Sequence, residues 1–395
     1  MVMSRSATPG DRNNVLALTG GIIHTGAETL HGHAVLIENG RIAGVSAEAD
    51  VPLSASRHDL AGDHLAPGFI DLQVNGGGGA LFNDTPTCDT VRLIADAHRA
   101  FGVTGLLPTY ITGPAHGMAH AADAVRQAMD NGTRVPGVLG IHFEGPHLNP
   151  ERAGVHDRSL IRPCNDADLA HLCALAAGCT LVTLAPECVS PEVIATLARH
   201  GAIIAAGHTM AGPDDLAAAV NAGLTGITHL FNAMAPMGSR APGTVGGALA
   251  DDRLWCSIIA DGHHVHPASM AAAWRAKPAG KLLLVSDAMG PVGSTAPASF
   301  TLGDAAVQVG DGRCVTADGR LAGSLLSMDA AVRYCVDTLD IGLDEALRMA
   351  ATYPARAINQ GDRRGQIAPG FVADLVRLDP ALIPQATWIA GQIST

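Results

Sequence analysis

The chain has 395 residues, a formal net charge of −12 and only two lysines, Lys277 and Lys281. That length suits one large α/β domain with a smaller attachment, and the acidic balance argues against a nucleic-acid partner. No apolar run could span a bilayer, the first residues lack the apolar core of a secretory signal, and the eight cysteines include no Cys-x-x-Cys pair. We therefore expect a cytoplasmic protein with reduced cysteines, and with neither a membrane nor a nucleic-acid partner.

Both ends of the chain are predicted to form short strands and turns. Within residues 1–66, the stretch HAVLIENGRIAGVS carries the Asn-Gly pair typical of a two-residue hairpin. Residues 363–395 have a similar pattern, and a charged run at 362–365, where this segment begins, is expected to be solvated. We predict that the two termini build one small β-sandwich beside a central domain of residues 67–362.

The central domain alternates short apolar runs with helical stretches rich in alanine and leucine, as in βα units with parallel strands. Eight such units predict an α/β fold of the (β/α)₈ barrel type. Residues 290–323 form a long Gly-rich insertion, expected to be a lid or hairpin near the mouth of the site. The expected strands are 69–76, 104–112, 138–146, 179–187, 201–209, 226–234, 255–264 and 281–289.

Polar side chains gather toward the C-terminal ends of six of these runs. Barrel enzymes take their catalytic groups from that end of the strands. A single terminal histidine would more often be a capping or packing residue, but six coincidences on one face favour a common site. The residues are Gln73, Asn75, Glu144, His208, His229, Asn232, His264 and Asp287.

Glu144, His208 and His229 form a candidate metal-ligand set of one carboxylate and two imidazoles. Such a set suits a catalytic Zn²⁺ or Fe²⁺ that keeps one position open. The alternative is that both histidines satisfy hydrogen bonds in the core. Asp287 could be a fourth ligand, a solvated turn residue or a general base, and its place beside a metal site favours the base.

Seven segments resemble, in order, the motifs of the N-acetylglucosamine-6-phosphate deacetylases, a family of the amidohydrolase superfamily. The resemblance extends from about residue 15 to the C-terminus. It implies metal-dependent hydrolysis of the acetamide of N-acetylglucosamine 6-phosphate to glucosamine 6-phosphate and acetate, in amino-sugar catabolism and cell-wall recycling, by a homodimer. The segments are PGFIDLQVNG, HFEGPHLN, TLAPE, AGHT, THLFNAM, IADGHHV and SDAMG.

The resemblance also implies the number of metal ions. Most members of the superfamily end strand one with His-x-His, and often carry a bridging carboxylated lysine on strand four. Here the first position reads Gln73-Val74-Asn75, and the fourth run contains no lysine. We therefore expect one divalent metal per chain, Zn²⁺ first, with Fe²⁺ or Co²⁺ as alternatives.

Further roles follow from the matched motifs. His156 is expected to polarise or orient the acetamide, and so to act as a catalytic residue beside Asp287. Asn232 and Ala233 are expected at the phosphate, and Gln73 is expected to form hydrogen bonds near the metal. Arg240 and His264 are expected to bind substrate, with Arg240 serving either its own site or that of the second subunit.

Three other functions remain open at this point. N-acetylgalactosamine 6-phosphate could be the substrate of the same chemistry, because the sequence does not report the orientation of the C4 hydroxyl group. A non-catalytic binding subunit is the alternative of a different class, and the intact set of Glu144, His208, His229 and Asp287 disfavours it. A cyclic-amide hydrolase such as a dihydroorotase is disfavoured by the missing His-x-His and bridging lysine.

Overall fold

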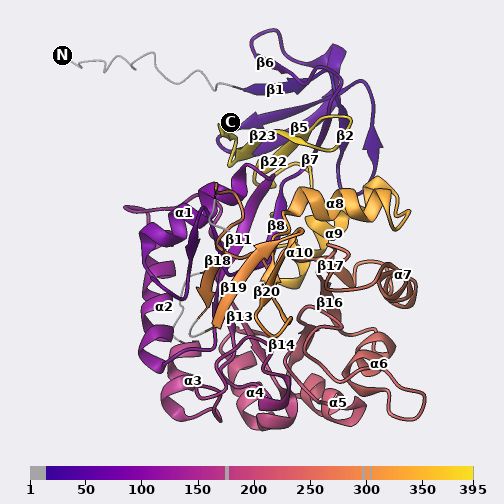
Figure 1. Ribbon diagram of the computed structural model, residues 1–395. Coiled ribbons are helices and arrows are strands. Elements are labelled where there is room, and N and C mark those ends of the chain that lie inside the picture. Colours follow the sequence, from indigo (N-terminus) through magenta and orange to yellow (C-terminus); the bar gives the residue numbers. More distant parts are fainter. Residues whose placement is uncertain (1–14, 174–177, 296–298, 303–304, 395) are drawn as a thin grey trace, which may run out of the picture.

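A barrel of eight parallel strands forms the centre of the molecule in the computed structural model, which describes residues 15–173, 178–295, 299–302 and 305–394 (Figure 1). The sheet order is β17-β16-β15-β14-β13-β12-β11-β8. The barrel closes where Val74 pairs in parallel with Ala288. The predicted (β/α)₈ fold is confirmed. The strands are β8 (Phe69–Val74), β11 (Val103–Ile111), β12 (Gly140–Glu144), β13 (Cys179–Leu184), β14 (Ile203–Ala206), β15 (Leu224–Ile227), β16 (Trp255–Ile258) and β17 (Leu282–Leu284).

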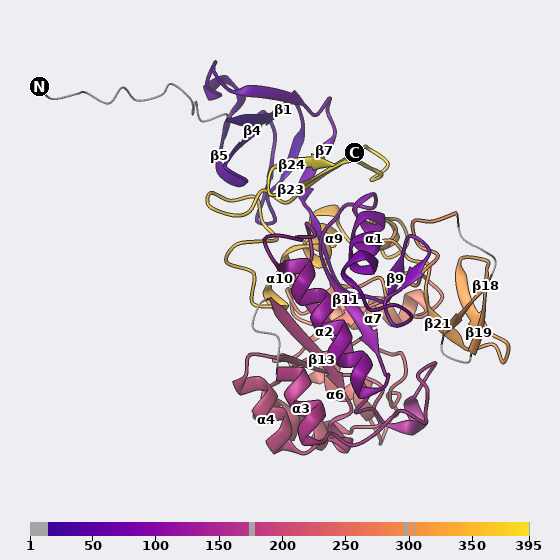
Figure 2. The same ribbon diagram turned by 90° about the vertical axis from the view of Figure 1, so that its left-hand side faces the viewer.

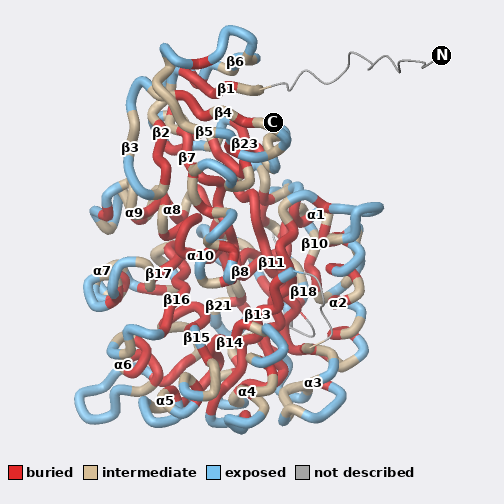
Figure 3. Tube along the Cα trace, turned by 180° about the vertical axis from the view of Figure 1, so that it is seen from behind, coloured by how far each residue is buried: buried red, intermediate tan, exposed pale blue. Residues whose placement is uncertain are grey.

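Helices surround the barrel and bury their apolar sides against it, as the burial pattern in Figure 3 shows. Several begin with proline in the first turn, which suits a helix start because proline lacks the N–H that would have no partner there. The helices are α1 (Cys88–Arg99), α2 (Ala115–Met129), α3 (Asp166–Cys173), α4 (Pro191–Arg199), α5 (Pro213–Ala222), α6 (Gly243–Ala250), α7 (Pro267–Ala276), α8 (Met328–Asp337), α9 (Leu343–Ala350) and α10 (Thr352–Ala357). No helix within the described part of the chain combines the length and apolarity that a membrane span requires.

Several barrel strands end earlier than the apolar runs in the sequence suggest. His208, His229 and Asp287 follow β14, β15 and β17 with backbone φ angles of 49°, 33° and 53°. A non-glycine residue in this left-handed region cannot continue a strand, so the chain turns there. The polar ends of the predicted strands are therefore loops at the barrel mouth.

Both termini contribute to a second, smaller β domain, which lies beside the barrel in Figure 2. One sheet has the order β5-β4-β1-β6 and the other β24-β23-β22-β7-β2-β3. Leu18, Ile42, Leu65 and Trp388 belong to the apolar cluster between them. The predicted sandwich of two chain ends is thus present. Its strands are β1 (Leu16–Thr19), β2 (Ile22–His24), β3 (Thr29–Leu30), β4 (His33–Glu38), β5 (Arg41–Ala47), β6 (Ser56–Asp59), β7 (His64–Pro67), β22 (Leu375–Leu378), β23 (Pro384–Ile389) and β24 (Gln392–Ser394).

The insertion after β17 forms an antiparallel sheet of four strands in the order β18-β19-β20-β21, at the right of Figure 2. These strands are β18 (Ser299–Leu302), β19 (Ala305–Gly310), β20 (Arg313–Thr316) and β21 (Leu321–Ser324). The remaining short elements are β9 (Gly76–Gly77), β10 (Ala80–Leu81) and the 3₁₀ turns η1 (Glu48–Asp50), η2 (Pro150–Arg152) and η3 (Pro186–Cys188).

One expectation for the C-terminal segment is wrong. Within the charged run at 362–365, the side chain of Arg364 is only 15% exposed and forms an ion pair with Asp374. Asp374 immediately precedes β22, so the partner of this guanidinium group comes from the C-terminal part of the sandwich. Asp362 and Arg363 are exposed, as expected.

Candidate active site

A pocket of ≈ 470 Å³ opens at the C-terminal ends of the barrel strands. Strand ends supply its inner wall, and the insertion supplies part of the outer wall through β18 and β21. The predicted site residues that line it are Asn75, Glu144, His156, His208, His229, Asn232, Ala233, His264 and Asp287. The structure therefore brings together residues that lie as far apart in the sequence as 75 and 287.

Three ligand atoms converge at the base of this pocket. Glu144 Oε1 lies 3.1 Å from His208 Nε2 and 2.9 Å from His229 Nε2, and the two imidazole nitrogens are 3.2 Å apart. Ligands at about 2.0–2.1 Å from a tetrahedral zinc ion lie roughly 3.3 Å from one another. The spacing of these three atoms therefore fits one face of a tetrahedral metal site.

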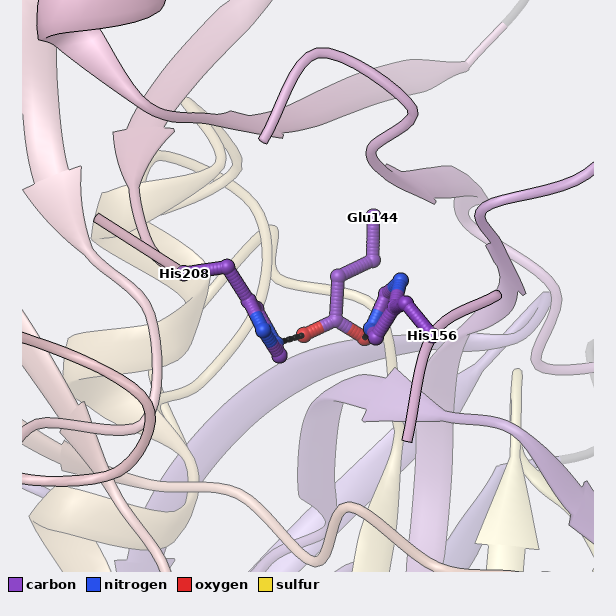
Figure 4. Close-up of side chains that lie close together, drawn as sticks. All are labelled: Glu144, His156 and His208. Atoms are coloured by element: carbon purple, nitrogen blue, oxygen red, sulfur yellow. Dashed lines mark hydrogen bonds and ion pairs between the residues drawn. The ribbon is translucent and has the colours of Figure 1, made fainter. Parts of the chain in front are cut away.

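The hydrogen bonds of His208 support a ligand role. Its Nδ1 lies 2.8 Å from the backbone carbonyl oxygen of Arg152, which can only accept, so Nδ1 carries the proton. In the neutral ring Nε2 is then unprotonated and faces the carboxylate of Glu144 (Figure 4). Two lone pairs so close together call for a cation between them, and metal-binding histidines commonly donate their second nitrogen to a carbonyl group.

His156 approaches the same carboxylate, with Nε2 4.0 Å from Glu144 Oε2 (Figure 4). Together with Glu144 and His208 it also forms a geometrically possible ligand group. However, its Nδ1 faces the backbone N–H of Thr112 at 3.4 Å, which can only donate, and the Thr112 hydroxyl at 2.8 Å, which can also donate, so the proton of the neutral ring is on Nε2. His156 thus presents an N–H donor to the pocket, and His229 is the better third ligand.

Burial and charge set the protonation of the two carboxyl groups. Burial acts to raise the pKa of Glu144, but the interactions with His208 and His229 outweigh it and hold that pKa well below its usual range. For Asp287, burial and the charge of Glu144 raise the pKa to about 6. The site therefore contains one permanently ionised carboxylate and one that exchanges protons near neutral pH. Burial, followed by the nearby His208, lowers the pKa of His156 to about 3, so this ring is neutral.

The two amides at the end of β8 have defined partners. Gln73 Nε2 donates to Glu144 Oε1 at 3.0 Å, and Asn75 Nδ2 donates to Asp287 Oδ1 at 2.6 Å. Each amide thus orients one carboxyl group of the site. Both amides act as hydrogen-bond donors to carboxyl groups here.

The other predicted substrate residues divide into two groups. Asn232, Ala233 and His264 line the pocket, and His264 Nδ1 is held 2.6 Å from Asp261 Oδ2. Arg240 does not line it, because it lies in the exposed loop between β15 and α6.

Sequence reasoning missed the two arginines that do line the pocket, Arg152 and Arg320. Arg320 Nη1 donates to the carbonyl oxygen of Gly154 at 2.6 Å, which joins the insertion to the loop that carries His156. The only signal in the sequence was that each arginine stands near glycines beside a segment already assigned to the site.

Comparisons with known proteins agree with this geometry. Residues 64–394 match the family model described as the amidohydrolase family, and residues 15–65 match the NagA composite domain. An N-acetylgalactosamine-6-phosphate deacetylase of Shewanella sp. (strain ANA-3) is 44% identical over 91% of either chain. An N-acetylglucosamine-6-phosphate deacetylase of Haemophilus influenzae is 33% identical over 92% of this chain and 95% of its own.

A solved structure gives the same result. The crystal structure of N-acetylglucosamine-6-phosphate deacetylase from Pasteurella multocida superposes with a TM-score of 0.93 at 34% identity, covering 96% of this chain and all of that one. The fold and the carboxylate–imidazole cluster define the class as barrel hydrolases of the amidohydrolase type. Within that class, the chain belongs to the N-acetylhexosamine-6-phosphate deacetylases, as the resemblance of its motifs implied.

Proposed function

We propose that the chain hydrolyses the acetamide of N-acetylglucosamine 6-phosphate to glucosamine 6-phosphate and acetate. The observation that carries this function is the convergence of Glu144, His208 and His229 beside Asp287 in one buried pocket, in a chain that belongs to this family. An intact set of this kind argues against a non-catalytic binding subunit.

Glu144, His208 and His229 would hold one divalent ion, which we propose to be Zn²⁺. When bound, this ion supplies Lewis acidity toward the acetyl carbonyl and lowers the pKa of a water molecule beside it. The protein contributes the orientation of the ligands, through the Arg152 carbonyl on His208 and the Gln73 amide on Glu144.

Asp287 and His156 divide the proton chemistry. With a pKa near 6, Asp287 is mostly ionised at neutral pH and can accept a proton from the attacking water. It then donates that proton to the nitrogen as the C–N bond breaks, which releases the free amine and acetate. His156, neutral with its proton on Nε2, donates a hydrogen bond to the acetyl oxygen as negative charge develops there.

The sugar phosphate would extend from this centre toward the outer wall of the pocket. Asn232, Ala233 and His264 lie on that path, and the cationic side chains in the pocket are Arg152 and Arg320. We propose that Arg240 reaches the pocket of a second subunit in a homodimer, because its side chain is exposed and does not line the pocket of its own chain. A cytoplasmic location would match a phosphorylated substrate.

N-acetylgalactosamine 6-phosphate is the second candidate substrate. The observation that favours it is the 44% identity to a deacetylase of that sugar, against 33% to 38% for deacetylases of the gluco sugar. The similar solved structures favour the first candidate, because two of them are deacetylases of the gluco sugar and one of these is a complex with N-acetylglucosamine 6-phosphate.

Acetate release from both hexosamine phosphates, measured with the same metal-loaded preparation, tests the function and ranks the two sugars. We expect kcat/KM to be higher for the gluco sugar. Asp287→Asn is the matched control, because it removes the base while leaving the proposed metal ligands in place. Acetate release that persists in this variant, or is absent from the wild type with both sugars, would contradict the proposal.

A further inference from the structure

A second and larger cavity of ≈ 790 Å³ lies at the opposite end of the barrel, where the barrel meets the sandwich. Its barrel wall includes Gly137–Leu139, just before β12, and its sandwich wall includes the β4–β5 turn and the β23–β24 hairpin. Glu144 stands at the far end of the same strand β12. Five residues at about 3.3 Å each separate the two ends by roughly 16 Å, so this cavity is distinct from the active site.

The charges that line this cavity have one sign. Although the chain has a net charge of −12, no Asp or Glu is found among the described residues of the cavity wall. The wall contains five arginines, which we call the arginine cluster: Arg41, Arg99, Arg134, Arg363 and Arg364.

Two members of the arginine cluster have carboxylate partners and three do not. Arg99 pairs with Asp96 at 2.9 Å, and Arg364 pairs with Asp374. Among the residues that the structure describes, the guanidinium group of Arg41 donates only to the carbonyl oxygen of Gly370, at 2.7 Å, and that of Arg363 only to the amide oxygen of Gln360, at 2.7 Å. Within the described part of the chain, Arg134 has neither a hydrogen-bond acceptor nor an ion-pair partner for its guanidinium group.

The guanidinium groups are close enough to repel one another. Burial, followed by the charges of Arg363, Arg134 and Arg41, lowers the pKa of Arg364 to about 10. Clustered like charges destabilise the empty cavity, and a bound anion would remove that cost.

We propose that this cavity is a binding site for a small organic anion carrying at least two phosphate charges, such as a diphosphate or bisphosphate. Three guanidinium groups that have no carboxylate partner among the described residues match the charge of such a ligand, and their planar donors suit bidentate contacts with phosphate oxygens. The same wall offers Met129, Leu139 and Ile389 for the carbon part of the ligand. This assignment is independent of the reaction proposed for the other end of the barrel.

Calorimetric titration of the full chain with pyrophosphate tests the charge component. The variant Arg134→Gln/Arg363→Gln should weaken binding at least tenfold, and neither substitution threatens folding because both side chains are exposed. The matched control is Arg199→Gln/Arg275→Gln, which removes the same charge from exposed positions on α4 and α7. We expect the control to bind like the wild type, and binding to weaken as salt is raised.

Three results would overturn the proposal. The wild type could fail to bind pyrophosphate, the control pair could weaken binding as much as the cavity pair, or His264→Gln could abolish binding, which would place the anion in the active site. Uridine diphosphate and fructose 1,6-bisphosphate then distinguish a nucleotide from a sugar bisphosphate, because the correct class should bind more tightly than pyrophosphate. Weaker binding of both would overturn the organic part of the proposal.

Discussion

The two ends of the barrel differ in which residue types occupy the left-handed backbone positions next to the strands. At the N-terminal ends of the strands, the chain enters through left-handed glycines such as Gly102, which has a φ of +81° and precedes β11. At the C-terminal ends, the left-handed positions after β14, β15 and β17 are occupied by His208, His229 and Asp287. Side chains in this region cost of order 1–3 kcal/mol each, whereas glycine adopts it freely.

This difference concerns backbone strain, which arises where a non-glycine residue has a positive φ. The C-terminal end carries histidines and carboxylates in left-handed conformations, aimed into a pocket. At the N-terminal end, glycines occupy left-handed positions before the strands and arginines line the cavity, although the sandwich turns at this cavity also contain two left-handed residues, Asn39 and Ala390. Among the barrel strands, left-handed side chains therefore stand at the end where they must converge on a pocket, and that pocket holds both carboxylates and arginines, whereas the wall of the other cavity holds arginines and no described Asp or Glu.

The largest effect is expected at a proposed metal ligand. His208→Ala removes an atom that the Arg152 carbonyl orients toward Glu144, so bound metal should fall from about one ion per chain to near zero, and turnover with it. Elemental analysis of the purified variant checks this. If the variant still binds about one metal ion per chain, His208 is not required as a metal ligand.

Asp287→Asn should separate the base from the ligands. Asn75 can still contact the side chain, so metal binding should persist while kcat falls by roughly 10²–10⁴-fold, as for loss of a general acid–base group. Acetate release and elemental analysis on the same sample measure both quantities. If this variant is purified without metal, Asp287 is a ligand and the proposed division of roles is wrong.

Between the two ends, Asp71 should make stability depend on pH. Burial above all raises its pKa from 3.8 to about 7, although its carboxyl group accepts hydrogen bonds from the backbone of Gln73 and Ser286. A raised pKa in the folded state means that its stabilising effect is present below about pH 4 and is lost as the pH rises through about 7.

The isosteric variant Asp71→Asn does not titrate and isolates this effect. Relative to it, the wild type should lose up to roughly 4 kcal/mol of stability between pH 4 and pH 8. The midpoints of thermal unfolding should therefore diverge over this range, with the variant the more stable at pH 8. If the unfolding midpoints of the two proteins change with pH by the same amount, the pKa of Asp71 is not raised in the folded state.

Arginine variants test how the positive charge at the functional end is supplied. Arg320→Gln and Arg240→Ala should each lower kcat/KM for the phosphorylated sugar by roughly ten- to a hundredfold, since a charge-assisted hydrogen bond contributes about 1.5–3 kcal/mol. Slow turnover of unphosphorylated N-acetylglucosamine should hardly change. Equal losses with both sugars would point to a structural role.

Mixing Arg240→Ala chains with Asp287→Asn chains distinguishes the two locations of Arg240. If Arg240 serves the partner's pocket, a mixed dimer has one intact site and activity returns. If it serves its own pocket, every site lacks one of the two groups and mixing does not restore activity. That result would contradict the proposal that Arg240 acts in the pocket of the partner subunit.

The smallest effect compares a glycine–alanine exchange at the two ends. At Gly102 an added Cβ would lie 2.9 Å from Phe69 Cε2 and 2.9 Å from Val376 Cγ2, in addition to the unfavourable φ, so Gly102→Ala should lower stability by about 1–3 kcal/mol. At residue 208, where φ is 49°, the glycine variant should be more stable than the alanine variant by roughly 1 kcal/mol. Thermal unfolding of the metal-free proteins measures both differences in stability. A Gly102→Ala variant more stable than the wild type, or a His208→Ala variant more stable than His208→Gly, would contradict this prediction.

Much of the fold and the membership of the catalytic face followed from the sequence. Apolar runs that alternate with helical stretches predict parallel strands, and the C-terminal ends of parallel strands must meet at one edge. Glu144, His208, His229 and Asp287 could therefore be grouped although they are far apart in the chain. The left-handed turns that end the strands could not be foreseen, because a histidine or an aspartate at the end of an apolar run gives no sign of a positive φ, unlike the Asn-Gly pair of the hairpin.

Tertiary structure alone decided the roles that depend on a specific partner. The carbonyl of Arg152 fixes the proton of His208, and the N–H of Thr112 fixes that of His156, which separates a ligand from a donor. Gln73 and Asn75 acquire their function from Glu144 and Asp287, more than 70 residues away. The arginine cluster is assembled from four separate segments and has no signature in any of them. Local patterns determine which residues share an element and a face, whereas hydrogen-bond direction and clustering of charge arise only when distant segments pack together.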